Sequence, residues 1–149
     1  MINQTPGITV PDGAVVPFIS ATPDSNSSDF NTIVNGQVIL PFSGKYIVSW
    51  QLNVTIPPPP PPPPVAPQFT EVQFTLGLSA STPATNPGTG QSSAGTIVLT
   101  SDIGFIQTTG QFIITATTGS ELALFNTSKM DVQLMSPIGN VGNFLIQVL

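Results

Sequence analysis

The chain has 149 residues, enough for one domain with a sizeable hydrophobic core and too few for two ordinary domains. It contains no His, no Cys and no Arg, and its only cations are Lys45 and Lys129. These absences remove the usual general base and the thiol nucleophile, so we expect no enzyme. A net charge of −5 argues against nucleic acid or an anionic membrane as a partner, since both need a basic patch.

Only 6% of the residues are charged, against roughly 25% in an ordinary soluble domain. Because charge repulsion normally keeps chains apart, this composition favours a protein that associates with itself. The first residues show neither a basic region nor an apolar core, so no signal peptide is recognised. No apolar run approaches the ~20 residues that a membrane span needs.

Short strands separated by turns are expected along most of the chain. The 13 Gly and 17 Pro leave little room for long helices. After an N-terminal arm at 1–14, the residue pattern predicts strands at 15–20, 32–34, 37–42, 45–54, 70–78, 95–100, 110–117, 121–126, 131–135 and 143–149. About ten short strands predict an all-β domain over residues 15–149, built as a sandwich, a jelly roll or a barrel.

The segment 35–55 carries the clearest strand signal. After a tight turn at Ser43-Gly44, large side chains alternate with mostly polar ones. This alternation predicts a strand with one buried face, made by Tyr46, Val48, Trp50, Leu52 and Val54. Trp50 is therefore expected to be a core residue and not a ligand platform.

Residues 57–67 form a polyproline loop, with eight consecutive prolines at 57–64. Proline cannot donate to a sheet ladder, so this segment is expected to be a stiff polyproline II connection between strands. One interpretation is a loop that contacts a partner or a neighbouring subunit through Pro57, Pro60 and Pro64. The other is a rigid spacer without a binding role, since no Lys or Arg flanks the run as in typical SH3 ligands.

Two segments near the C-terminus are apolar on both faces: Phe112-Ile113-Ile114 and Phe144-Leu145-Ile146. A sandwich strand in a monomer needs only one apolar face. The second face is covered either by a loop or by another subunit, and the low charge favours the subunit. The expected subunit interface consists of Phe112, Ile114, Phe144, Leu145, Ile146 and Leu149.

Other candidate sites carry weaker signals. Four carboxylates offer oxygen ligands for Ca²⁺ without the spacing of a binding loop: Asp24, Asp29, Asp102 and Asp131. We interpret them as solvated turn residues, with a bound calcium ion as the alternative, and assign no metal ligand and no cofactor. Four Asn-x-Ser/Thr sequons begin at Asn3, Asn26, Asn53 and Asn126, and are interpreted as chance matches in a Thr- and Asn-rich chain.

Two groups of spaced residues follow a known pattern. The first contains Asp29-Phe30-Asn31, Gly36-Gln37-Val38 and Pro41-Phe42-Ser43-Gly44-Lys45-Tyr46. The second contains Gly110-Gln111-Phe112-Ile113, Gly119-Ser120-Glu121-Leu122-Ala123-Leu124 and the closing segment 144–149. Together they resemble the C1q/TNF-like jelly-roll family over roughly residues 15–149. That family has a P-x-x-G-x-Y turn before a long inner strand, and later a Gly-Asp hairpin from which Gly119-Ser120-Glu121 departs.

The short, Cys-free, Thr/Asn-rich form is similar to the C-terminal domains of bacterial spore exosporium collagen-like glycoproteins. The resemblance implies an antiparallel jelly-roll sandwich that forms a trimeric, non-enzymatic head on a spore or cell surface or in a fibre. Its partners would be further copies of itself and other surface or fibre proteins. The alternative is a receptor- or carbohydrate-binding adhesin or tail-fibre tip.

Overall fold

The structure, a computed structural model, describes residues 2–3, 8–18, 20–21, 33–34, 36–55, 68–78, 90–99, 106–134 and 142–149. In these ranges every regular element is a β-strand, and every strand pair is antiparallel. None of the described residues forms a helix that could serve as a membrane span. The prediction of an all-β antiparallel fold is confirmed.

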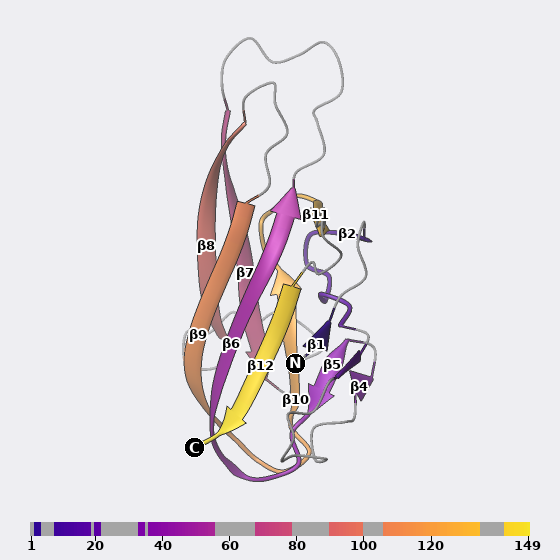
Figure 1. Cartoon of the computed structure of the whole chain (residues 1–149), viewed down its shortest axis with the longest axis vertical. Coiled ribbons are helices and arrows are strands. Elements are labelled where there is room, and N and C mark those ends of the chain that lie inside the picture. Colours follow the sequence, from indigo (N-terminus) through magenta and orange to yellow (C-terminus); the bar gives the residue numbers. More distant parts are fainter. Residues whose placement is uncertain are drawn as a thin grey trace.

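Two five-stranded sheets form the two layers of a sandwich (Figure 1). The first sheet has the order β4 (Ile33–Val34), β5 (Gln37–Ile39), β10 (Glu121–Asn126), β7 (Gln68–Leu78) and β8 (Gly90–Leu99). The second has the order β12 (Gly142–Val148), β6 (Gly44–Thr55), β11 (Val132–Leu134) and β2 (Ile8–Val10), with β9 (Ile106–Ala116) on the other side of β6. A small third sheet pairs β1 (Ile2–Asn3) with β3 (Ser20–Ala21).

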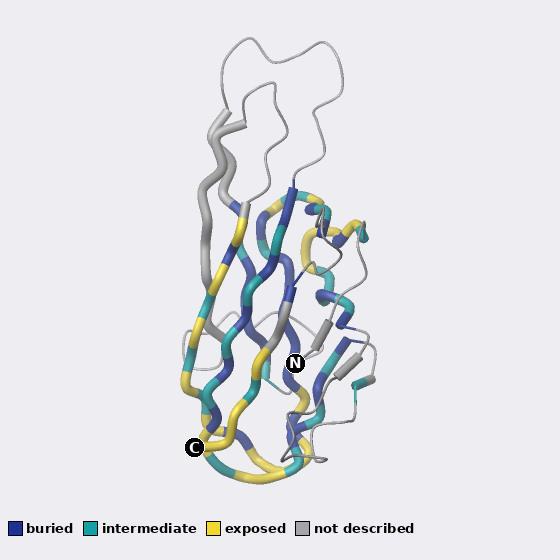
Figure 2. The backbone as a smooth tube through the Cα atoms, viewed as in Figure 1, coloured by how far each residue is buried: buried dark blue, intermediate teal, exposed yellow. Residues whose placement is uncertain are grey.

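Strand β6 is the centre of the second sheet because it has long partners on both sides. β12 pairs with it from Tyr46 to Leu52, and β9 pairs with it from Gly44 to Val54 without a bulge. Burial alternates along β6 as the sequence predicted (Figure 2). Its buried side chains meet those of the first sheet in one hydrophobic core that includes Val38, Val72, Phe74, Leu76, Leu122 and Leu124.

Two glycines beside β6 make room for its large side chains. Gly110 on β9 pairs with Trp50, and a Cβ atom at this position would overlap the indole ring. Gly142 on β12 pairs with Leu52, where a Cβ atom would collide with Leu52 Cδ2. The indole extends over β9 at Gly110 and stacks on Phe112 with ring centroids 5.4 Å apart. An aromatic ring that covers a strand glycine in this way pins the register of the two strands.

Tyr46 closes the turn that precedes β6. Its hydroxyl donates a hydrogen bond to the Phe42 carbonyl oxygen and accepts one from the Phe42 N–H at 3.2 Å. Ser43 Oγ in the same turn accepts the N–H of Thr118 at 2.9 Å. The β5–β6 turn is therefore tied both to the first core residue of β6 and to the β9–β10 turn.

Asn126, at the end of β10, joins segments that are distant in the sequence. Its side chain is fully buried, and its Nδ2 donates to the carbonyl oxygens of Val10 at 2.9 Å and Met130 at 2.8 Å. Its Oδ1 accepts the N–H of Ser128 at 3.0 Å. Both amide protons are engaged and the side chain is inaccessible, so folded protein cannot carry a glycan at Asn126, which supports the interpretation of that sequon as a chance match.

A threonine on the core side of β9 has an unpaired hydroxyl. Thr108 is 3% exposed, and its Oγ1 has no hydrogen-bond partner within the part of the chain that the structure describes. A buried hydroxyl without a partner costs about 1–3 kcal/mol, and valine has nearly the same shape without that group. Thr108→Val should therefore raise the free energy of unfolding by about 1 kcal/mol.

Urea denaturation followed by circular dichroism measures this change. Thr9→Val is the matched control, because Thr9 is an exposed strand residue on β2. It should change the free energy of unfolding by less than about 0.5 kcal/mol. A Thr108→Val variant less stable than the parent would contradict the assignment of an unpaired hydroxyl.

Candidate functional site

The side of the second sheet that faces away from the core carries the candidate site, and we call it the outward face. Its side chains alternate with the core residues of β6 and β9, so exposed positions recur along β9 (Figure 2). Strand register arranges them in rows across the sheet. Ile47 lies between Ile113 and Gln147, and the next row contains Gln111, Ser49 and Leu145.

One end of this face is apolar, where β6 begins and β9 and β12 end (Figure 1). Ile113 is 60% exposed and Leu149 is 63% exposed, and the Leu149 N–H donates to the Lys45 carbonyl oxygen at 2.9 Å. We define the apolar end as Ile47, Ile113, Leu145 and Leu149. The other exposed large hydrophobic side chains among the described residues lie off this face, since Val148 pairs with the core residue Tyr46 and Phe42 lies in the turn before β6. A gathering of apolar side chains such as the apolar end is typical of an interaction surface.

The expected interface residues fall on both sides of the sheet. Leu145 and Leu149 are exposed at the apolar end. Phe112, Ile114 and Ile146 pair with core residues of β6 and lie partly buried against the core. These three therefore belong to the core side of the sheet, and only their remaining exposure is available to a partner.

Phe144 pairs with Trp50 through the backbone, and its side chain lies outside the described part. Ile113 was not among the residues predicted to form the interface, although it is the most exposed apolar residue of β9. Three successive apolar residues do not reveal which of them faces the core. Only the pairing of Ile113 with Ile47, which shares its side of the sheet, decides this.

Among the strands that the structure describes, β9 pairs only with β6 and is therefore an edge strand. It contains no charged residue and no proline, and its register with β6 is unbroken. Strand β8 adjoins it from the other sheet and is also uncharged. Natural edge strands are normally protected by charges, prolines or bulges, so the β8/β9 edge is a second surface suited to contact with another chain.

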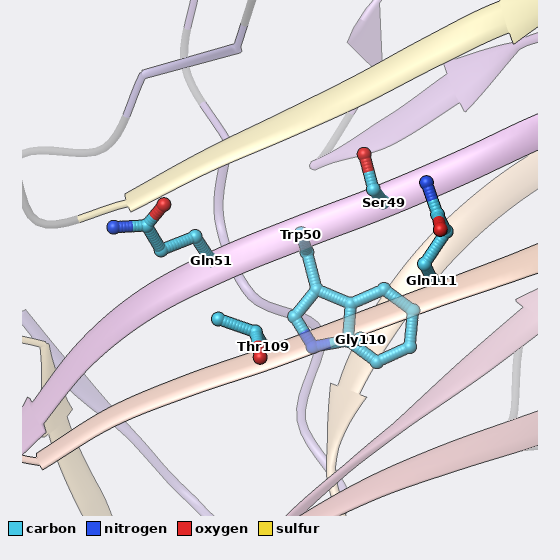
Figure 3. Close-up of a pocket in the computed structure, with 6 residues that line it drawn as sticks. All are labelled: Ser49, Trp50, Gln51, Thr109, Gly110 and Gln111. Carbon is cyan, nitrogen blue, oxygen red and sulfur yellow. The ribbon is translucent and has the colours of Figure 1, made fainter.

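A polar belt lies next to the apolar end on the outward face. We define the polar belt as Ser49, Gln51, Asn53, Gln107, Thr109 and Gln111. Four of its members, together with Trp50 and Gly110, line a hollow of about 430 Å³ (Figure 3). Within the belt, Gln107 Nε2 donates to Asn53 Oδ1 at 3.3 Å. The belt offers hydrogen-bond donors and acceptors without any charge.

Charged groups are nearly absent from this face. Lys45 is the one charged residue in the sequences of β6, β9 and β12. Asp12 and Lys129 lie elsewhere, where Asp12 Oδ1 accepts the Lys129 N–H at 3.0 Å. Glu121 begins β10 in the other sheet. The outward face is therefore a nearly uncharged surface on an acidic chain.

Several sequence-based candidates are not gathered into a site. The described residues contain no group of three or more side chains that could hold a metal ion. Asp131 is exposed, whereas the remaining calcium candidates lie outside the described residues: Asp24, Asp29 and Asp102. The proposed contact residues of the polyproline loop, Pro57, Pro60 and Pro64, also lie outside them.

Comparison with solved structures shows what this sandwich resembles. The Eiger TNF from S. frugiperda matches with a TM-score of 0.69 and 16% sequence identity, covering 99% of this chain and 88% of that one. The globular domain of the zebrafish complement 1qA protein matches with a TM-score of 0.58 and 11% identity, covering 97% of this chain and 90% of that one. The fold is a C1q/TNF-like jelly roll. Neither a protein-family model nor a curated protein matches the sequence.

The turn between β9 and β10 of this C1q/TNF-like jelly roll has a side-chain cap. Ser120 Oγ accepts the Thr117 N–H at 3.2 Å. Gly119 in this turn has a φ of 83°, a conformation that favours glycine. Serine and glycine together therefore close the turn between β9 and β10.

Proposed function

We propose that the protein is a non-enzymatic structural module that assembles as a homotrimer. The observation that carries the proposal is the apolar end, where the exposed side chains of Ile113, Leu145 and Leu149 lie together on a nearly uncharged face. Interface centres are poor in charge and rich in apolar side chains. Domains of the C1q/TNF type form trimers.

The presence of two different contact surfaces supports a ring. The apolar end lies on the outward face, whereas the β8/β9 edge lies at the side of the sandwich. A twofold dimer uses one surface that contacts its own copy, while two unlike surfaces favour head-to-tail contacts that close into a ring. Phe112 and Ile114 lie on the edge strand β9 and are only partly buried. A neighbouring subunit would complete their burial.

A spore or cell surface, or a fibre, is the proposed location. A surface with few titrating groups and few ion pairs resists changes of pH and salt, which suits an exposed assembly. The alternative, an adhesin or a tail-fibre tip that binds a receptor or carbohydrate, has weaker support. Sugar sites commonly present exposed aromatic rings, whereas Trp50 and Tyr46 are buried.

Light scattering and sedimentation velocity test the assembly. At micromolar concentration the parent protein should show about three times the 15.5 kDa mass of one chain. Leu145→Asp and Ile113→Asp should give folded monomers, because an unpaired carboxylate buried between subunits costs several kcal/mol per site. Thr9→Asp, at the exposed position of β2, is the control and should remain assembled.

Ile146→Asp distinguishes an interface effect from a folding effect. Ile146 pairs with Val48 on the core side, so a carboxylate there should abolish the folded circular dichroism spectrum. Leu145→Asp, one residue away on the outward face, should keep that spectrum. A parent protein with a mass near 15.5 kDa would contradict the proposal.

A further inference from the structure

Four side chains of the polar belt have no hydrogen-bond partner among the described residues. No hydrogen bond from the described residues reaches the side-chain polar atoms of Ser49, Gln51, Thr109 or Gln111. The one hydrogen bond within the belt joins Gln107 to Asn53. The belt therefore has unused donors and acceptors around the hollow (Figure 3).

The arrangement of these groups makes the belt self-complementary. Ser49 pairs in register with Gln111, and Gln51 pairs with Thr109, so each row places an amide beside a hydroxyl. An amide side chain has two N–H donors and an acceptor oxygen, and a hydroxyl both donates and accepts. Where three subunits surround the axis of a ring, the same four groups can consequently hydrogen-bond to their own copies on the neighbouring subunits.

Charge favours a second copy as the occupant of this surface. Each chain has a net charge of −5, so copies repel one another unless they meet through an uncharged face. The belt is uncharged and continuous with the apolar end, since Ile47 and Ser49 are successive outward residues of β6, as are Gln111 and Ile113 of β9. A subunit seated on the apolar end therefore reaches the belt.

We propose that the polar belt is the part of the subunit interface that fixes how the copies are aligned. Amides and hydroxyls of neighbouring subunits hydrogen-bond across the interface at Ser49, Gln51, Thr109 and Gln111. The apolar end attracts another subunit without fixing its orientation. The belt stabilises one relative alignment of the subunits, because a shifted subunit would leave buried polar groups without hydrogen bonds. This inference rests on the proposed self-assembly. It adds the residues that determine the relative alignment of the subunits.

Charges of either sign at one belt position test the inference. Gln111→Glu and Gln111→Lys each place like charges from several copies close together, so both should raise the dissociation constant of the assembly by at least about tenfold at low salt. Gln51→Glu and Gln51→Lys should act in the same direction. A partner of opposite charge at this surface would instead be favoured by one sign and disfavoured by the other.

Two further measurements use sedimentation velocity on the same proteins. An equimolar mixture of Gln111→Glu and Gln111→Lys should recover assembled mass, because unlike charges then meet at the interface. Sodium chloride at 1 M should restore part of the assembly of each single variant by screening. Thr9→Glu and Thr9→Lys change the net charge equally on exposed β2 and should assemble like the parent protein.

The outcomes separate the two proposals. If the parent protein is assembled and all four charged belt variants assemble with unchanged dissociation constants, the belt is not at the interface, and the inference fails while the proposed self-assembly stands. If the belt variants and the Thr9 controls weaken assembly equally, net charge explains the result and the inference also fails. A monomeric parent protein would overturn both.

Discussion

Replacing Trp50 with alanine should lower the free energy of unfolding by about 3–5 kcal/mol, the usual range for a buried aromatic side chain cut back to alanine. The indole is 2% exposed, lies over Gly110 and stacks on Phe112. Since position 110 has no side chain, the residue that pairs with Trp50 on β9 cannot move in to fill the vacated space. A cavity that collapses only in part places the expected loss well within this range.

Urea denaturation by circular dichroism at one fixed protein concentration measures this loss, because association links stability to concentration. Trp50→Phe is the matched control, since it retains a ring beside Phe112 and should cost less. The native fluorescence of Trp50 should be blue-shifted and poorly quenched by iodide. Strong quenching would contradict the buried position and would make the aromatic ring available to a ligand.

Gly110→Ala should cost about 1–3 kcal/mol, the usual range for overpacking a well-filled core. The added Cβ atom would overlap Trp50 side-chain carbons, so either the indole or the β9 backbone must move. Strand propensity alone predicts the opposite sign, because alanine is more favourable than glycine within a strand. A lower free energy of unfolding would therefore support the close contact between the indole and Gly110, and a higher one would contradict it.

A double-mutant cycle isolates the contact between the two residues. In a Trp50→Leu background the indole is absent, so Gly110→Ala should cost less than it does in the parent chain. The coupling free energy should be at least about 1 kcal/mol, as for other residues in direct contact. Equal costs in both backgrounds would show that the glycine is required for another reason.

The bounds of two strands were predicted from the sequence almost to the residue. Strand β10 has the predicted bounds 121–126, and β6 exceeds its prediction of 45–54 by one residue at each end. β9 begins at Ile106, four residues before the expected start at 110. Its early part contains Gln107, Thr108 and Thr109, which give no apolar pattern and are held in the strand by pairing with β6. Such pairing is not visible in the local sequence.

The N-terminal part of the chain shows where local patterns fail. Residues 15–20 were expected to form a strand, but Val15 makes only an isolated bridge with Phe125, and 16–18 have no regular structure. Pro17 has no N–H to donate, which interrupts a ladder at this point. Val16 and Phe18 are still buried, so their apolar character reflects the core and not a strand. Strand β2, assigned to the arm, instead pairs with β11, more than a hundred residues away.

The candidate site could be predicted only in part, because strand pairing between distant segments is not visible in the local sequence. Composition indicated self-association, and the apolar segments near Ile113 and Leu145 were identified as unusual. The choice between the two sides of each strand depends on register with β6, which is a property of the folded sheet. The polar belt gave no signal because Ser, Thr and Gln are ordinary residues on an exposed strand face.

The central position of β6 has a consequence for how the chain folds. Its partners in the described part of the chain are β9, β11 and β12, which all follow it in the sequence. During synthesis, the pairing of β6 with β12 therefore cannot be completed until Val148 has been added to the chain. Contacts across such long sequence separations make folding slow, on the order of milliseconds to seconds. Until the last strand is released from the ribosome, the growing chain has an unpaired strand that other nascent chains can capture.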